Sequence, residues 1–409
     1  MLMLKLAFRN ILRNKRRTIL TMLSMFGGYV LLTLSISVQN GSYVQVIDFF
    51  TRDSTGHAQI SEVGYQDKPT LYKSVPETTD FYQQLMQVDG VQRATPRIVS
   101  SALAYGETKS FPVQVIGVDV EKEARMSFLE EKVKTGQYLE VGPDSDGYYS
   151  ALIGAAVARQ LSLEMGDELI LISQGADGSM ANDLYRVVGV VGSTEGAEAR
   201  NVYLPLAAAQ SFFVMPEQAH YWAVLTSDYE RSDQLSQRLN SWLDGDSELE
   251  AVTWKVVSKE FYETMKADVE GGYVAYYIII FLVCIGVLNT VLMSVLERTG
   301  EFGVLKAIGT SPGRVFTLIV TETLMLAVLS CLAGLIVAMP INYYLAAVGF
   351  VLPEPMEVSG VIMSHMKGLW DVKTFMEPAL IVIGSAALIS LFPARRAAKI
   401  VPVDAMRSL

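Results

Sequence analysis

Cysteine and histidine are scarce in this chain of 409 residues, and their scarcity removes several classes of function. The two cysteines, Cys284 and Cys331, fall inside apolar runs, so no disulfide framework is expected. The three histidines, His57, His220 and His365, are too scattered for a metal site or a catalytic triad. We therefore expect neither catalytic residues nor a metal site.

The sequence also lacks a glycine-rich phosphate-binding loop ending in Lys-Ser or Lys-Thr. The chain alone is therefore not expected to be an ATPase of that kind or to hold a cofactor, and we expect no nucleic-acid partner. The carboxylates Glu121, Glu123, Glu130 and Glu131 are expected to form a solvated acidic face.

Apolar residues, by contrast, are abundant: they make up 51% of the chain, and the mean hydropathy is +0.30. Four runs are long enough to cross a bilayer, which takes about 20 helical residues. The expected spans are 18–38, 273–296, 315–341 and 377–394. The first is longer than the apolar segment of a signal peptide, which favours an uncleaved span. The expected fold is a membrane α-helical protein with four transmembrane helices and a large extracytoplasmic α+β domain between helices 1 and 2.

Charge is distributed unevenly along the chain, and its distribution indicates which segments face the cytoplasm. Residues 41–270 hold 18 Lys and Arg against 35 Asp and Glu, a net charge of −17, and the remaining segments carry +7. Short basic segments belong on the cytoplasmic side, so both termini and the loop 297–314 are expected in the cytoplasm. The acidic domain 39–272 and the short loop 342–376 are then outside, and 395–409 is a cytoplasmic tail.

The acidic domain has the pattern of mixed helices and strands, with an inserted subdomain at about 117–215. Strands are expected at 98–105, 111–118, 168–172, 185–191 and 223–225, and helices at 79–87, 154–161, 205–213 and 228–243. A further helix at 259–266, interrupted by Gly271 and Gly272, leads toward the second span.

Two short segments next to the spans suggest surface helices. Residues 1–17 place Arg9, Arg13, Arg16 and Arg17 opposite apolar positions, a pattern typical of a helix on an anionic membrane surface. In the loop 297–314, Thr299 can cap a helix of about nine or ten residues that stops at Gly309. Its apolar positions would present an aromatic knob, Phe302, to a groove in a partner protein.

Two polar residues inside expected spans, Asn289 and Glu322, also require an explanation. An ionisable group within a span costs about 3 kcal/mol, so Glu322 should face another helix, a cavity or the interface. A proton or substrate relay and a structural hydrogen bond between helices both remain open. Small residues in the first and third spans, such as Gly28 and Gly334, would permit close helix packing.

Three motifs resemble one family of membrane proteins. Residues 300–311 read Gly-Glu-Phe-Gly-Val-Leu-Lys-Ala-Ile-Gly-Thr-Ser, and the chain begins with Leu-Ala-Phe-Arg-Asn-Ile-Leu-Arg-Asn-Lys-Arg-Arg at 6–17. Residues 393–407, from Pro-Ala-Arg-Arg to Asp-Ala-Met-Arg, resemble the family's other end. Together with the order of spans, these motifs resemble ABC transporter permeases of the FtsX, MacB and LolC/LolE type (type VII).

The resemblance implies a permease subunit that is not itself an enzyme, with ATP and Mg²⁺ bound by a separate ATPase subunit in the cytoplasm. The helix in the loop 297–314 would be the coupling helix. Its candidate coupling residues are Glu301, Phe302, Gly303, Val304, Leu305, Lys306, Ile308 and Gly309.

The location implied is the bacterial inner membrane, with the outer domain in the periplasm and built of a porter-like part plus an insertion. The further partners implied are a second permease copy or a paralogue, membrane lipid, and a periplasmic carrier, adaptor or hydrolase. Release of a lipid-linked substrate such as a lipoprotein is the leading function. FtsX-like regulation of a periplasmic partner and MacB-like drug or peptide efflux remain alternatives.

Overall fold

A computed structural model describes residues 15–106, 109–194, 196–243, 248–358 and 361–401. It divides into two compact units. Of the described residues, those within 15–44, 265–351 and 365–401 form the helical unit, and those within 45–264 and 352–364 form the α+β unit. Arg9 and Arg13 of the expected surface helix lie outside the described residues, whereas Arg16 is exposed in helix α2 and Arg17 also belongs to α2.

Within the described residues, four helices are long and apolar enough to cross a membrane by length and composition. They are α2 (Lys15–Phe50), α9 (Lys259–Glu297), α11 (Pro312–Ala347) and α12 (Val372–Ala398). The α+β unit lies between α2 and α9 in the sequence, so the expected fold class is confirmed. Strands β13 (Phe350–Val358) and β14 (Val361–Met366) form a two-stranded sheet between α11 and α12.

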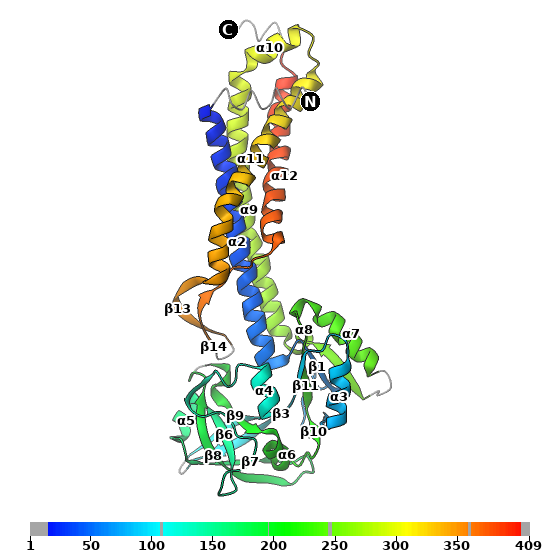
Figure 1. Cartoon of the computed structure of the whole chain (residues 1–409), viewed down its shortest axis with the longest axis vertical. Coiled ribbons are helices and arrows are strands. Elements are labelled where there is room, and N and C mark those ends of the chain that lie inside the picture. Colours follow the sequence, from blue (N-terminus) through cyan, green and yellow to red (C-terminus); the bar gives the residue numbers. More distant parts are fainter. Residues whose placement is uncertain (1–14, 107–108, 195, 244–247, 359–360, 402–409) are drawn as a thin grey trace. The chain divides into compact units, whose positions relative to one another are not determined.

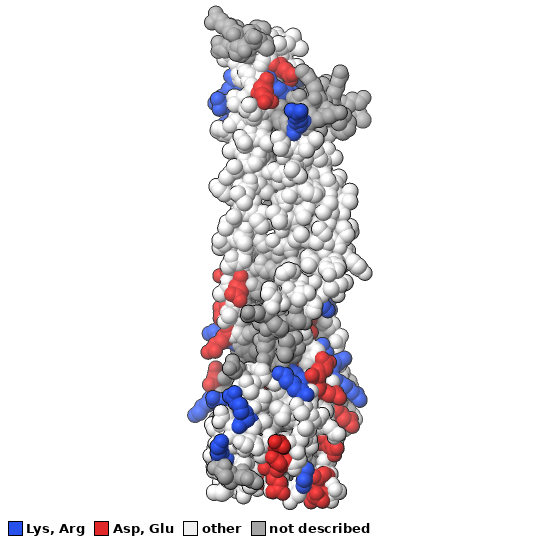
Figure 2. Space-filling view, turned by 90° about the vertical axis from the view of Figure 1, so that its left-hand side faces the viewer, with Lys and Arg blue, Asp and Glu red and all other residues white. Residues whose placement is uncertain are grey.

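The helices pack through small side chains and a stripe of valines. Val283, Val287, Val291 and Val295 recur every fourth residue of α9 and are buried in the core of the helical unit. A Cβ added at Gly28 of α2 would clash with the side chain of Val283, so α2 and α9 approach closely there. The face of this unit seen in Figure 2 carries a broad band without Lys, Arg, Asp or Glu, as a lipid-facing surface requires.

The expected interruption at Gly271 and Gly272 is wrong, because α9 is continuous from Lys259 to Glu297. A Cβ added at Gly272 would overlap the carboxamide of Gln39 on α2, whereas Gly271 has open space around it. Gly272 therefore provides close helix contact rather than a break.

Four antiparallel strands and two helices form the first part of the α+β unit (Figure 1). The strands are β1 (Ala58–Glu62), β3 (Arg93–Tyr105), β11 (Tyr221–Leu225) and β12 (Leu249–Thr253), in the order β12-β1-β11-β3. Helix α3 (Thr79–Gln87) joins β1 to β3, and α7 (Ser232–Trp242) joins β11 to β12. Leu85, Leu235 and Leu239 of these helices share one core with Ala58 and Ile60 of β1, so they cover one face of a split β-α-β sheet.

A closed ring of six strands forms the second part. β3 pairs with β4 and β7, β4 with β9, β9 with β6, and β6 and β7 both pair with β8. The strands of the ring besides β3 are β4 (Ser110–Val118), β6 (Tyr149–Gly154), β7 (Glu168–Gln174), β8 (Met180–Val191) and β9 (Asn201–Pro205). Strand β5 (Val133–Gly136) pairs antiparallel with β8. This closed ring is a small β-barrel, and because β3 belongs to both parts, the barrel is fused to the split sheet. The border of the inserted subdomain stays a prediction.

All nine expected elements of the α+β unit have counterparts. Helix α3 has the expected bounds, and α5 (Ala155–Leu161), α6 (Leu206–Phe212) and α7 lie inside the expected ranges. The remaining helices are α4 (Val120–Met126), α8 (Trp254–Val257), the π-helix η1 (Thr51–Thr55) and the 3-10 helices η2 (Ala197–Arg200) and η3 (Tyr229–Arg231). Strands β2 (Val75–Pro76) and β10 (Gln218–Ala219) pair with each other.

Candidate functional site

The helix expected in the loop between the second and third spans is present as α10 (Thr299–Ala307). Gly309, with φ of +98°, ends it, and Ser311 and Pro312 begin α11. The capping role expected of Thr299 is wrong. Its hydroxyl donates instead to the carbonyl oxygens of Val295 and Leu296, at 3.1 and 2.8 Å, which continues the hydrogen-bonding pattern from the end of α9.

Arg298, between α9 and α10, holds α10 against α11. Its Nη1 donates to both carboxylate oxygens of Glu322, at 3.0 and 3.3 Å, and its Nε donates to Glu301 at 3.0 Å. The guanidinium also lies 5.1 Å from the ring centroid of Phe302. The side chains of Arg298 and Glu322 are only 9% and 10% exposed, so each neutralises the other's charge out of contact with water.

This pair favours the structural interpretation of Glu322 over the relay interpretation, because the carboxylate is committed to Arg298. Asn289 is exposed on α9, and nothing in the described residues brings it to Glu322. Sequence reasoning did not select Arg298. One feature of the sequence could have identified it. An acidic residue inside a span needs a counter-ion, and Arg298 is a basic residue near the same membrane face as Glu322.

Lys306 connects α10 to the end of α12. Its Nζ donates to the carbonyl oxygens of Ala398, at 3.0 Å, and Ile400, at 2.5 Å. A cation at this position satisfies free carbonyl groups and complements the negative end of the α12 dipole. Helix α10 is thus anchored by charged side chains to both α11 and α12.

The face of α10 left exposed differs from the expected one. Phe302 is 1% exposed and Gly303 is buried, while Leu305 packs partly against the core of the helical unit. Phe302 is therefore not a protruding knob, because the Arg298 side chain and the core enclose its ring. Three apolar residues are exposed instead: Val304 at 46%, Ile308 at 75%, and Ala307 between them.

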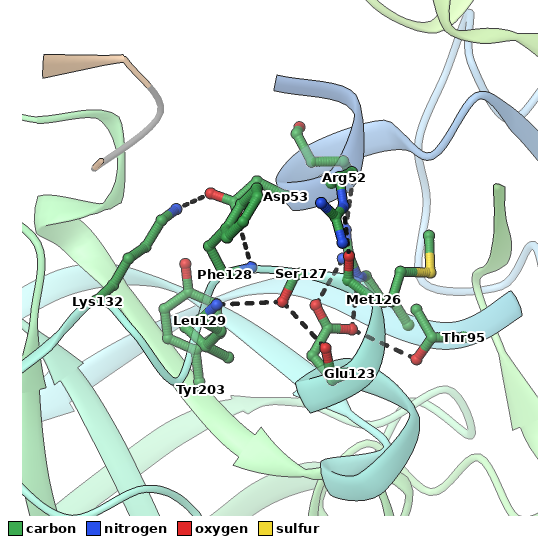
Figure 3. A network of polar contacts seen from close by, with 12 residues as sticks. Arg52, Asp53, Thr95, Glu123, Met126, Ser127, Phe128, Leu129, Lys132 and Tyr203 are labelled. Carbon is green, nitrogen blue, oxygen red and sulfur yellow. Dashed lines mark hydrogen bonds and ion pairs between the residues drawn. The ribbon is translucent and has the colours of Figure 1, made fainter. Parts of the chain in front are cut away.

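A second charged cluster lies in the α+β unit, where η1 follows α2 (Figure 3). Arg97 of β3 donates to both carboxylate oxygens of Glu123, at 3.1 and 2.6 Å, and to the carbonyl oxygen of Ser54 at 2.6 Å. Thr95 also donates to Glu123, at 3.3 Å. Glu123 is 2% exposed, so its expected place on a solvated face is wrong, whereas Glu121, Glu130 and Glu131 are exposed as expected.

Beside this pair, Lys132 forms ion pairs with Asp53 of η1 and, at 2.7 Å, with Glu198 of η2. Asp53 also accepts a hydrogen bond from the backbone N–H of Phe128 at 3.1 Å. The π-helix is therefore fixed by buried charges to the α4–β5 connection and to η2. A π-helix is rare and often marks a functional position, and the sequence offered no signal for this one.

Comparisons with known proteins agree with these two units. The family model of the MacB-like periplasmic core domain matches residues 18–242, and that of the FtsX-like permease C-terminal matches residues 273–402. The lipoprotein-releasing system transmembrane protein LolE of Haemophilus influenzae is 21% identical over 93% of this chain and 92% of its own length.

Two further comparisons cover the chain differently. The pyoverdine export ATP-binding/permease protein PvdT of Pseudomonas fluorescens is 23% identical over 98% of this chain, which corresponds to 58% of its own length. The crystal structure of the periplasmic region of MacB from Actinobacillus actinomycetemcomitans is 18% identical, with a TM-score of 0.37 over 55% of this chain and 98% of that chain.

Proposed function

Because the chain belongs to the ABC transporter permease family with a MacB-like periplasmic core domain and an FtsX-like permease domain, we propose that it couples ATP hydrolysis on a separate chain to release of a lipid-linked substrate. ATP and Mg²⁺ would bind to that ATPase chain. The match over 92% of the length of LolE, which is named as a transmembrane protein of its system, supports a separate ATPase chain.

The anchoring of α10 is the observation that carries the proposal. Charged contacts of Arg298 and Lys306 hold this short helix to α11 and α12, and it leaves Val304, Ala307 and Ile308 exposed. A short helix with exposed apolar side chains fits a hydrophobic groove of a partner protein. Force applied there by the ATPase would reach α11 and α12 through these contacts, so we propose this face as the ATPase-docking surface.

The same proposal places the chain in the bacterial inner membrane, with both termini and α10 in the cytoplasm and the α+β unit in the periplasm. Support comes from the basic residues at α10 and the end of α12, set against the net charge of −17 for residues 41–270. Four spans are few for a transport path, so a second copy or a paralogue would complete the membrane part.

Docking is tested by adding the cognate ATPase to the permease in lipid nanodiscs and measuring ATP hydrolysis. Val304→Asp and Ile308→Asp should each lower the permease-dependent ATPase rate at least tenfold, because they place a charge in the apolar contact. Val141→Asp is the matched control at an exposed valine of the α+β unit, and its rate should equal wild type. Unchanged rates in both α10 variants would refute the docking surface.

The substrate is proposed from the near full-length match to LolE, a protein of a lipoprotein-releasing system by its name. Proteoliposomes that contain the permease, the ATPase and a triacylated lipoprotein should release the lipoprotein to a soluble periplasmic carrier only when ATP is hydrolysed. The match to PvdT, named for pyoverdine export, favours efflux as the second candidate. ATP-dependent transport of pyoverdine without lipoprotein release would establish efflux. Activation of a periplasmic hydrolase without transport of either substrate would instead indicate a regulatory permease.

A further inference from the structure

A cavity of about 380 Å³ lies within the α+β unit, against the sheet face opposite α3 and α7. Residues of η1 (Ser54 and Thr55), of β1 (Gln59) and of β11 (Tyr221) contribute to it, together with the segment that follows β1. Its volume is at the lower end of the range for pockets that bind small molecules.

The lining of this cavity contains no charge, although the surrounding domain is strongly acidic. All fifteen lining residues are uncharged, and eleven carry a hydroxyl or a carboxamide group. Among them are Gln59, Gln66 and Gln114, with Ser100 and Ser101. Such a lining offers both donors and acceptors but nothing to neutralise an ionic ligand, so it favours an uncharged and strongly polar molecule.

Most of the main chain around the cavity is already paired. β1, β11 and β4 each have hydrogen-bonded neighbours on both sides, whereas residues 98–102 of β3 pair with β4 alone, and the N–H of Val99 donates to Nδ1 of His220. Side chains therefore supply most of the recognition, which suits a ligand with many hydrogen-bonding groups of its own.

Gln59 is the most informative of these side chains. It is 3% exposed, and its Oε1 accepts a hydrogen bond of 2.8 Å from Gln66. Within the described residues its amide nitrogen has no hydrogen-bond partner. Because Gln59 lines the cavity, a ligand acceptor there would give this amide nitrogen a hydrogen-bond partner.

We propose that this cavity binds a neutral saccharide, with Gln59 donating to a sugar oxygen and Gln66 holding the Gln59 carboxamide in place. Ring hydroxyl groups supply the acceptors and donors that this lining matches, and a ligand of one or two rings suits a small cavity. The site is separate from the face of α10, so it is independent of the proposed ATPase coupling.

The test is saturation-transfer difference NMR on the full chain in phospholipid nanodiscs, which avoids detergents with sugar headgroups. The probes are N,N′-diacetylchitobiose and maltose, with triglycine amide and glucose 6-phosphate as competing ligand classes. We expect signals from at least one disaccharide and at least a fivefold weaker affinity for Gln59→Met and Gln66→Ala, because a hydrogen bond is lost. Gln237→Ala, an exposed glutamine of α7, should bind as wild type does.

Gln66 is only half-buried, so its variant keeps the test valid if Gln59→Met fails to fold. No signal from either disaccharide would overturn the proposal, and so would equal affinity in wild type and Gln66→Ala. Saturable binding of triglycine amide or glucose 6-phosphate in preference to both disaccharides would also overturn it.

Discussion

Replacing Glu123 by Gln should destabilise the α+β unit strongly, although it changes only one oxygen atom to an NH₂ group. The carboxylate is the bidentate partner of Arg97, and the two side chains are 3% and 4% exposed. Removing one member of a buried ion pair costs about 3 to 5 kcal/mol, because the other charge stays buried without compensation. For a unit of this size each kcal/mol lowers the melting temperature by about 2 to 4 °C, so we expect a fall of about 6 to 20 °C.

Tryptophan fluorescence during heating measures this effect in the full chain. Trp222, Trp242 and Trp254, three of the four tryptophans, lie in the α+β unit. Glu121→Gln is the matched control, because Glu121 is exposed on the same helix and its loss should cost less than about 1 kcal/mol. The double variant Arg97→Met/Glu123→Leu should regain much of the lost stability. If Glu123→Gln had the same melting temperature as Glu121→Gln, the buried ion pair would not stabilise the unit.

Three further changes test other parts of the structure. Burial lowers the pKa of His220 to about 4, so below the unfolded pKa of about 6.5 the unfolded chain binds more protons. Stability of the α+β unit should therefore fall as the pH drops from 6.5 to 4, by up to about 1.4 kcal/mol per pH unit, and His220→Gln should flatten this slope in urea titrations. A Cβ at Gly334 would lie 2.5 Å from Cδ1 of Tyr29, so Gly334→Leu should lower the melting temperature of the helical unit, whereas Gly384→Leu, with open space around it, should not. Arg298→Met should reduce ATPase coupling by freeing α10, and the measurement that checks it is stimulation of ATP hydrolysis by the permease at saturating ATPase concentration.

The sequence predicted elements well where one feature repeated at a regular interval. Strand β4 alternates buried and exposed residues in part, and the second span is a long apolar run, so each was visible. Strands β1, β6 and β9 were not predicted, because they are buried along almost their whole length and lack alternation. The π-helix η1 was missed because its five polar residues, Thr-Arg-Asp-Ser-Thr, have no apolar periodicity that separates a helix from a loop.

The candidate coupling helix was likewise predictable only in part. Gly309 and Pro312 mark its end, and the short distance between two spans requires a loop, so its position was predictable. Which side of it would be buried was not, because Phe302 and Ile308 are both apolar and only the packing against α11 and α12 separates them. The partnership of Arg298 with Glu322 joins the α9–α10 junction to α11 across 24 positions of sequence, so it depends on how these segments meet.

The sequence by itself determined four spans, an acidic α+β domain between the first two, a short helix in the basic loop and the family to which the motifs belong. These features follow from local composition, because apolar length, charge and turn residues act over a few neighbouring positions. Tertiary structure decided the buried partners of Arg97, Lys132 and Arg298, the uncharged cavity beside Gln59, and the exposed face of α10. Each of these depends on contacts between distant segments, which no local pattern encodes.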